Sequence, residues 1–123
     1  MTIIDLTIVS GASFRVSFDW KNPDGTPVFL SGYSAKMQIR PNPTSSTIYY
    51  TLATNPTEGQ GTIEVDLVTS SFKVHIPDEV TATFTWPYGT YDILAIAPNA
   101  PDGDVELVVK GRVTVSKTTT KLN

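Results

Sequence analysis

The stretch Ser13-Phe-Arg-Val-Ser-Phe-Asp-Trp20 carries the pattern that decides the fold of this chain. Apolar residues occupy every second position, and the residues between them are polar or charged. Successive side chains of a β-strand point to opposite faces, whereas an amphipathic helix repeats its apolar residues every three to four positions. The stretch therefore predicts a strand with one buried face and one wet face.

Seven further segments of the chain show a similar pattern. They are residues 4–8, 33–39, 48–52, 63–67, 72–76, 90–97 and 105–115. Turn-forming residues separate them, as in Asn22-Pro-Asp-Gly25, and the stretch 78–83 could add one helical turn. Eight short strands with frequent turns are typical of a two-layer sandwich, which we favour over a small barrel.

The length and composition agree with one all-β domain. The chain has 123 residues, and its β-branched and aromatic residues outnumber its strong helix formers, which excludes a helical bundle. The apolar fraction of 40% is too high for a disordered chain. We expect a single domain over residues 1–116, followed by a polar, Thr-rich tail at 117–123.

Charge and cysteine content exclude several classes of function. The net charge is −3, and the nine Lys and Arg residues are scattered singly, so we expect no nucleic-acid partner. There is no cysteine for a disulfide scaffold, a thiolate metal site or a nucleophile. No apolar stretch approaches the ~20 residues of a membrane span, and the N-terminus has no signal-peptide pattern, so we expect no membrane partner.

The residues that could carry chemistry do not form an enzyme motif. His75 is the only histidine, on the polar side of its alternating segment, with no serine or cysteine nucleophile motif beside it. Asp102-Gly-Asp104-Val-Glu106 lacks the length of a calcium loop and is typical of a hairpin turn. We expect no enzymatic activity, no catalytic residues, no metal and no cofactor.

Asp92 stands out because it interrupts an apolar segment that we expect to lie between two layers. A buried carboxylate needs a partner, and Arg40 and Arg112 are the candidates. We predict a structural ion pair between Asp92 and one of these arginines.

Trp86, Pro87 and Tyr88 form the best candidate contact surface, because they lie in a connection between strands. Exposed aromatic rings contact either sugars or proteins. Trp20, Tyr33 and Tyr50 continue inward-facing alternations and are expected in the core.

Two features concern the ends of the domain. Gly111 interrupts the last apolar segment, which predicts a β-bulge or a close approach of another backbone. The first segment, residues 2–9, has no Pro or Lys and only one charge, so it would be poorly protected at the edge of a sheet. We expect one or both terminal segments to contact another subunit, by strand addition or by wrapping.

Seven short motifs follow one another along the chain: Gly11-Ala-Ser-Phe14, Asp24-Gly-Thr-Pro27, Leu30-Ser-Gly-Tyr33, Ala35-Lys-Met-Gln-Ile-Arg40, Gly89-Thr-Tyr-Asp-Ile93, Pro101-Asp-Gly103 and Gly111-Arg-Val-Thr-Val115. In this order they resemble the small virion-associated proteins of tailed bacteriophages. The layout is similar to the immunoglobulin-like N-terminal domain of upper-baseplate proteins.

This resemblance implies an immunoglobulin-like, two-layer antiparallel β-sandwich of about seven to eight strands. It also implies a non-enzymatic structural component of the virion, assembled in the bacterial host cytoplasm as a baseplate, fibre-adaptor or capsid-decoration subunit. Its partners would be other phage virion proteins and copies of itself. The alternative is a carbohydrate-binding or host-recognition β-sandwich module.

Overall fold

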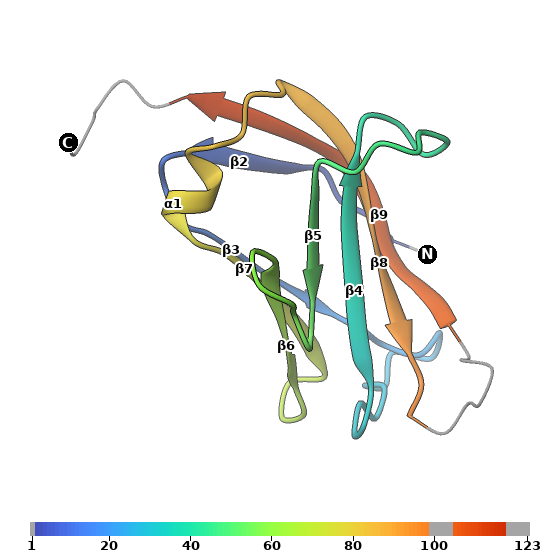
Figure 1. The fold of residues 1–123 in the computed structure, drawn as a ribbon. Helices are drawn as coiled ribbons and strands as arrows, with labels where there is room; N and C mark the ends of the chain where they lie inside the picture. Colours follow the sequence, from blue (N-terminus) through green and yellow to red (C-terminus); the bar gives the residue numbers. More distant parts are fainter. Residues whose placement is uncertain (1, 99–104, 118–123) are drawn as a thin grey trace.

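The computed structural model describes residues 2–98 and 105–117, and this part of the chain is almost entirely β-structure (Figure 1). All eight alternating segments form strands, and the predicted helical turn is found directly after Pro77. The elements are β1 (Thr2–Ile3), β2 (Leu6–Ser10), β3 (Phe14–Asp19), β4 (Ser34–Arg40), β5 (Tyr50–Ala53), β6 (Gly61–Asp66), β7 (Ser71–Ile76), α1 (Asp78–Thr81), β8 (Tyr88–Ile96) and β9 (Val105–Lys117).

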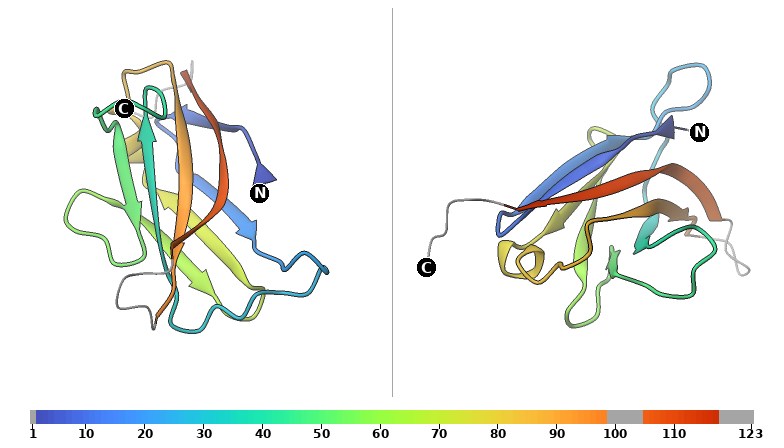
Figure 2. Two further views of the ribbon diagram at one scale, coloured as in Figure 1. Left: turned by 90° about the vertical axis from the view of Figure 1, so that its right-hand side faces the viewer. Right: turned by 90° about the horizontal axis from the view of Figure 1, so that it is seen from above.

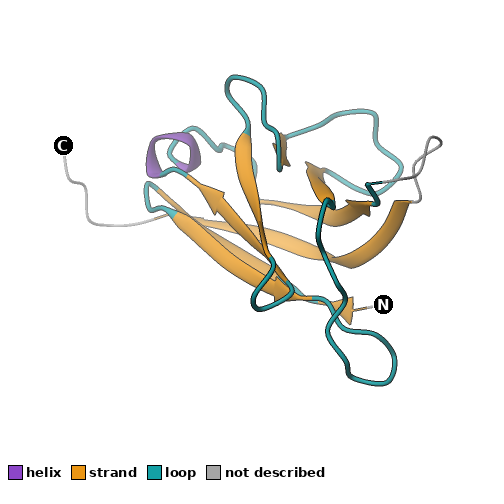
Figure 3. Ribbon diagram, turned by 90° about the horizontal axis from the view of Figure 1, so that it is seen from below, coloured by secondary structure: helices purple, strands orange, loops and turns teal. Residues whose placement is uncertain are grey.

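The strands form one mixed sheet that is nearly closed. Its order is β1-β9-β8-β4-β5-β6-β7-β3, and β2 also pairs with β9. The sheet folds back on itself, so that β4, β5, β8 and β9 face β3, β6 and β7 across the core (Figures 1 and 3). The fold is therefore all-β, as expected.

Pairing is not antiparallel throughout, which corrects our expectation. The strands β1 and β2 run parallel to β9 in one register, from Thr2 opposite Val109 to Ser10 opposite Lys117 (Figure 2). The two halves of the sheet meet at β5 and β6 through a short parallel contact, at Leu52–Gly61 and Ala53–Thr62. In both places the paired strands meet because the sheet folds back on itself. A local sequence pattern does not reveal such pairing.

The inward-facing residues of the alternating segments form one core. Its largest fully buried side chains come from both halves of the sheet: Ile8, Leu30, Met37, Ile39, Leu52, Ile63, Phe72, Val74, Ile76, Ile93, Val109 and Val113. Trp20, Tyr33 and Tyr50 are half-buried and pack against this core, as predicted.

The bulge in β9 lies at Val108 and not at Gly111. Ile93 pairs with Val109 and Leu94 with Leu107, so Val108 is an extra residue, and both Val108 and Val109 are buried. Gly111 instead provides the predicted close backbone approach, because a Cβ there would overlap the carbonyl group of Ile4.

Two expectations fall on residues outside the described part of the chain. The predicted hairpin turn at Asp102-Gly103 lies in the gap between β8 and β9. Of the predicted tail at 117–123, only Lys117 is described, as the last residue of β9.

Candidate functional site

A groove of about 830 Å³ runs over the outer face of β4, β8 and β9 and contains the residues of the predicted ion pair. Strand pairing places its polar side chains in two rows. Gln38, Asp92 and Lys110 form one row, and Arg40, Thr90 and Arg112 form the other. Asp5 and Ile3 from the N-terminal segment complete one side of the groove.

The structure brings Asp92, Arg40 and Arg112 into this groove but does not join them as we predicted. Asp92 is exposed, because the outer face of β8 is not covered by the other half of the sheet. Among the described residues the only salt bridge within 4.0 Å joins Lys73 Nζ and Asp66 Oδ2, at 2.9 Å. The expectation of a buried Asp92 in a direct ion pair is therefore wrong.

Arg40 and Arg112 make other interactions within the groove. The guanidinium group of Arg40 donates hydrogen bonds of 2.7 Å to the carbonyl of Ser45 and to Oε1 of Gln38. The backbone amide of Arg112 donates to Oδ1 of Asp5 at 3.0 Å. Both arginines are thus part of the groove's lining without neutralising Asp92 by contact.

The groove still changes the electrostatics of Asp92. Partial loss of hydration against its walls raises the pKa of the Asp92 carboxyl group, and the positive charges of Arg40 and Lys110 oppose that rise. Desolvation is the larger effect. The carboxylate therefore lies in the groove near two positive charges, but its partial loss of hydration favours the protonated form.

The three residues of the predicted aromatic contact surface do not lie together on the surface, because one is buried and two are exposed. Trp86 is buried and stacks on Tyr49 with ring centroids 4.8 Å apart and an interplanar angle of 3°. It also packs on Phe84 at 5.0 Å. Pro87 is exposed and Tyr88 is 63% exposed, so only these two residues of the predicted trio can meet a partner.

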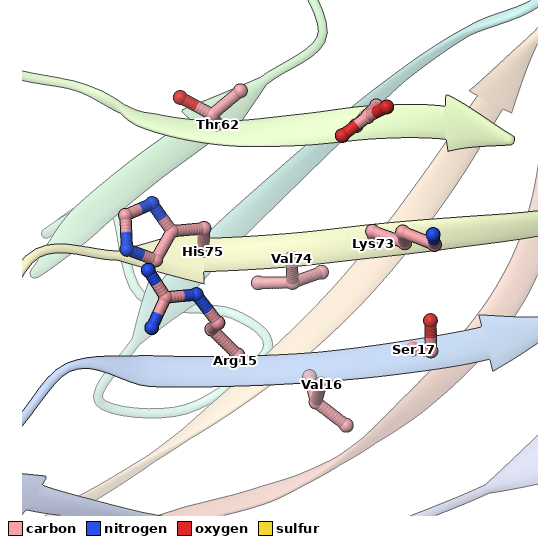
Figure 4. Close-up of a pocket in the computed structure, with 8 residues that line it drawn as sticks. Arg15, Val16, Ser17, Thr62, Lys73, Val74 and His75 are labelled. Carbon is pink, nitrogen blue, oxygen red and sulfur yellow. The ribbon is translucent and has the colours of Figure 1, made fainter.

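A second hollow, of about 490 Å³, lies on the outer face of β3, β6 and β7 (Figure 4). Its rows are set by strand pairing: Arg15, His75 and Thr62 lie side by side, and Ser17, Lys73 and Glu64 form the next row. Ser17 faces Lys73 and not His75, so this arrangement does not form a nucleophile–base pair. It offers a polar, mostly exposed face.

The described ranges contain neither a cluster of metal-ligand side chains nor a helix that could span a membrane. Residues 2–98 and 105–117 contain no group of three or more His, Cys, Asp or Glu side chains that could hold a metal ion. No helix in the same ranges is long and apolar enough to cross a bilayer.

The residues at the open edge of β3 are not among those that the sequence singled out. Arg15, Ser17 and Asp19 point to its wet face, and β3 is the last strand of the sheet order. Their alternation predicted an exposed face, but nothing in the local pattern marks a strand as an edge. The feature of these residues that the sequence does show is their charge order, which runs from positive to neutral to negative.

Comparison with known proteins found no protein-family model and no curated protein that matches this chain.

Proposed function

We propose that this chain is a non-enzymatic structural subunit of a tailed-phage virion, built on an immunoglobulin-like β-sandwich and acting through protein–protein contacts. The proposal gives it no cofactor and no metal. Its partners are other virion proteins and copies of itself, and it joins the particle in the cytoplasm of the bacterial host.

The strand pairing supports the immunoglobulin-like part of this proposal. One set of strands is β3, β7 and β6, and the other is β2, β9, β8, β4 and β5. This grouping resembles the variable-type immunoglobulin arrangement, in which a four-stranded sheet packs against a five-stranded sheet. The contact between β5 and β6 covers only two residue pairs, so the two sets are joined weakly.

The observation that carries the proposed function is that the sheet formed by residues 2–98 and 105–117 does not close. It leaves two open edges, one on the N-terminal strands β1 and β2 and one on β3, and we call the opening between these edges the seam. The sheet order begins with the N-terminal strands and ends with β3, and the outer edges of these strands have no strand partner in the described part of the chain. Open edges with apolar neighbours favour association with another chain. Ile3, Ile4 and Val9 on the N-terminal edge are 67%, 38% and 37% exposed.

The alternative, a carbohydrate-binding or host-recognition module, has less support. It rested on a platform of exposed rings at Trp86 and Tyr88, and Trp86 is occupied by its stack on Tyr49. A single exposed tyrosine is a poor platform for a sugar ring, so we do not propose this function.

The proposal is tested on purified particles of a phage whose genome encodes the chain. We expect mass spectrometry to detect the protein at a fixed copy number and cryo-electron microscopy to place it at symmetric positions. Its absence from purified particles, with the protein free in the lysate, would contradict the proposal.

An edge variant sharpens this test. Ile3→Lys combined with Val9→Lys should reduce incorporation, because it places charges on the exposed apolar N-terminal edge. Val68→Lys is the matched control, since Val68 is 95% exposed in the turn between β6 and β7. Equal incorporation of both variants would show that the N-terminal edge makes no contact in the particle.

A further inference from the structure

The open edge of β3 presents a defined set of backbone groups. β3 pairs antiparallel with β7 in one unbroken register, from Phe14 opposite Ile76 to Asp19 opposite Ser71. The amide of Trp20 continues this register and donates to the carbonyl of Ser70 at 2.9 Å. Because bonding alternates along an antiparallel strand, the even-numbered residues bond to β7, and the backbone groups of Arg15, Ser17 and Asp19 face the seam.

Apart from the charges of Arg15 and Asp19, this edge lacks the usual protection against pairing. The strand contains no proline, no lysine and no bulge. On its inner side, Phe14 and Val16 are only half-buried, whereas Phe18 is 3% exposed. A strand added at the seam would cover the two residues that the core leaves partly open.

The outward side chains of β3 complement a second copy of themselves. Along the strand, the three outward residues are a positive one, a small one and a negative one: Arg15, Ser17 and Asp19. All three are exposed. The side chains of Arg15 and Asp19 make no hydrogen bond or ion pair with another described residue. When such a strand pairs antiparallel with its own copy about Ser17, each arginine lies opposite an aspartate.

We propose that a second copy of this chain pairs antiparallel with β3, with Ser17 on the two-fold axis and Arg15 opposite Asp19 of the partner subunit. The inference deepens the proposed function, since it names the surface on which the subunit would meet its own copy. A two-fold contact of this kind uses the same patch on both subunits.

Neighbouring registers can also bring edge backbone groups together, but they do not pair the charges. Centring the pair on Phe18 would place Asp19 opposite Ser17 of the partner subunit and leave Arg15 without an opposite charge. Centring it on Val16 would leave Arg15 opposite Ser17 of the partner subunit. The charge order therefore selects the register about Ser17.

The length of the contact is limited by the chain that follows β3. The amide of Val28 donates to the carbonyl of Trp20 at 3.1 Å, and Lys21 bridges Pro27, so a small hairpin begins at Trp20. Pairing thus extends over Arg15 to Asp19. A contact this short is weak in solution and gains strength from the high local concentration within an assembly.

The chain has no cysteine, so a single introduced thiol tests the two-fold axis directly. In the proposed pair the two Ser17 Cα atoms lie about 5.5 Å apart, which suits a disulfide. We expect Ser17→Cys in the full chain to form a disulfide-linked dimer in a glutathione redox buffer. Thr62→Cys is the matched control, because Thr62 is exposed on the same face but lies within the sheet on β6.

Charge variants test the register. Asp19→Arg should raise the dimer dissociation constant about tenfold or more, because it places two arginine pairs in opposition. Combining it with Arg15→Asp should restore dimerisation, since the charges are then exchanged and again complementary. Glu58→Arg, with the same change of charge in an exposed turn, should leave the dissociation constant unchanged.

Amide hydrogen exchange separates the possible occupants of the edge. Protection of the Arg15, Ser17 and Asp19 amides that rises with protein concentration is the expected result. Protection that is complete at every concentration would show that the chain's own residues cover the edge, and would overturn the inference. A chain that stays monomeric up to about 1 mM, or equal crosslinking at residues 17 and 62, would overturn it as well. Virion incorporation is measured separately, so failure here leaves the proposed function standing.

Discussion

The hydroxyl group of Tyr91 donates a hydrogen bond of 2.6 Å to the carbonyl oxygen of Ile4. Tyr91 lies opposite Gly111 in the register of β8 and β9, and the Ile4 carbonyl occupies the space that a side chain at Gly111 would fill. The amide of Ile4 in turn donates to the carbonyl of Lys110 at 2.9 Å. The missing side chain of Gly111 thus lets the N-terminal segment approach β9 closely, where the Tyr91 phenol holds it.

The first prediction concerns this phenol. Tyr91→Phe should lower the free energy of unfolding by about 1 kcal/mol, the usual net value of one such bond. Urea unfolding of both proteins measures the change. Amide exchange at residues 3–5 should also become faster, because those residues lose their tie to β8. Unchanged exchange there would show that the hydrogen bond does not hold the N-terminal segment.

A second prediction follows from the acidity of the same group. Burial, with the charge of Asp5 adding to it, raises the pKa of Tyr91 to about 12. An unfolded tyrosine has a pKa of about 10, so between these values the unfolded chain releases a proton that the folded chain keeps. The contribution of Tyr91 is therefore complete below about pH 10 and falls as the pH rises towards about 12.

Urea unfolding from pH 9 to pH 12 checks this sign. We expect the stability difference between the unmodified chain and Tyr91→Phe to shrink across that range, because the variant has no phenol at this position to titrate. A difference that stays constant would contradict the raised pKa. The comparison is insensitive to the other tyrosines, which both proteins share.

Gly111→Ala supplies a third prediction. The added methyl group would overlap the backbone of Ile4, which cannot move aside as a flexible side chain would. We expect a loss of about 1–3 kcal/mol, as for other forced overpacking. Arg112→Ala is the control, since the Arg112 backbone amide that bonds to Asp5 is retained. A loss in the control as large as that of Gly111→Ala would exclude the steric explanation.

The strands of this protein were predictable because alternation is a local property. Each alternating segment became a strand, and the inward set, such as Phe18, Met37 and Ile63, became the core. The parallel pairing of the N-terminal strands with β9 was not predictable. It depends on where the sheet closes, which is a relationship between residues about a hundred positions apart.

The candidate sites were less predictable for the same reason. Asp92 was expected to be buried because its segment is apolar on both faces, yet one face of β8 lines an open groove. Trp86 was expected to be exposed because it lies in a connection, yet Tyr49 from another connection provides a stacking partner. Long-range neighbours decide both cases, and neither leaves a signal in the adjacent residues.

The fourth prediction concerns the buried hydroxyl group of Tyr50. The hydroxyl oxygen of Tyr50 is buried and has no hydrogen-bond partner among the described residues, and burial raises its pKa. Phe84 packs against its ring with centroids 5.4 Å apart. Tyr50→Phe should therefore raise the free energy of unfolding, by about 1 kcal/mol, because it removes an unsatisfied group and keeps the packing. Urea unfolding should show the opposite sign to Tyr91→Phe, although the chemical change is the same. A loss of stability would mean that the hydroxyl group has a partner.

The last prediction separates the groove around Asp92 from the ion pair that the sequence suggested. A buried pair would make removal of the carboxylate cost about 3 kcal/mol or more. In the groove, desolvation raises the pKa of Asp92 more than Arg40 and Lys110 lower it, so the folded state disfavours the charged form. Asp92→Asn should thus change the free energy of unfolding at pH 7 by less than about 1 kcal/mol, with a gain in stability as the expected sign.

The pH dependence of this effect follows from the same pKa. As the pH falls through the pKa of Asp92, the folded chain binds the proton first, so the stability advantage of Asp92→Asn should shrink. Urea unfolding at pH 7 and pH 3 measures this trend, and NMR titration of the carboxyl carbon gives the pKa directly. A large loss at pH 7, or a pKa below that of an ordinary aspartate, would restore the ion pair.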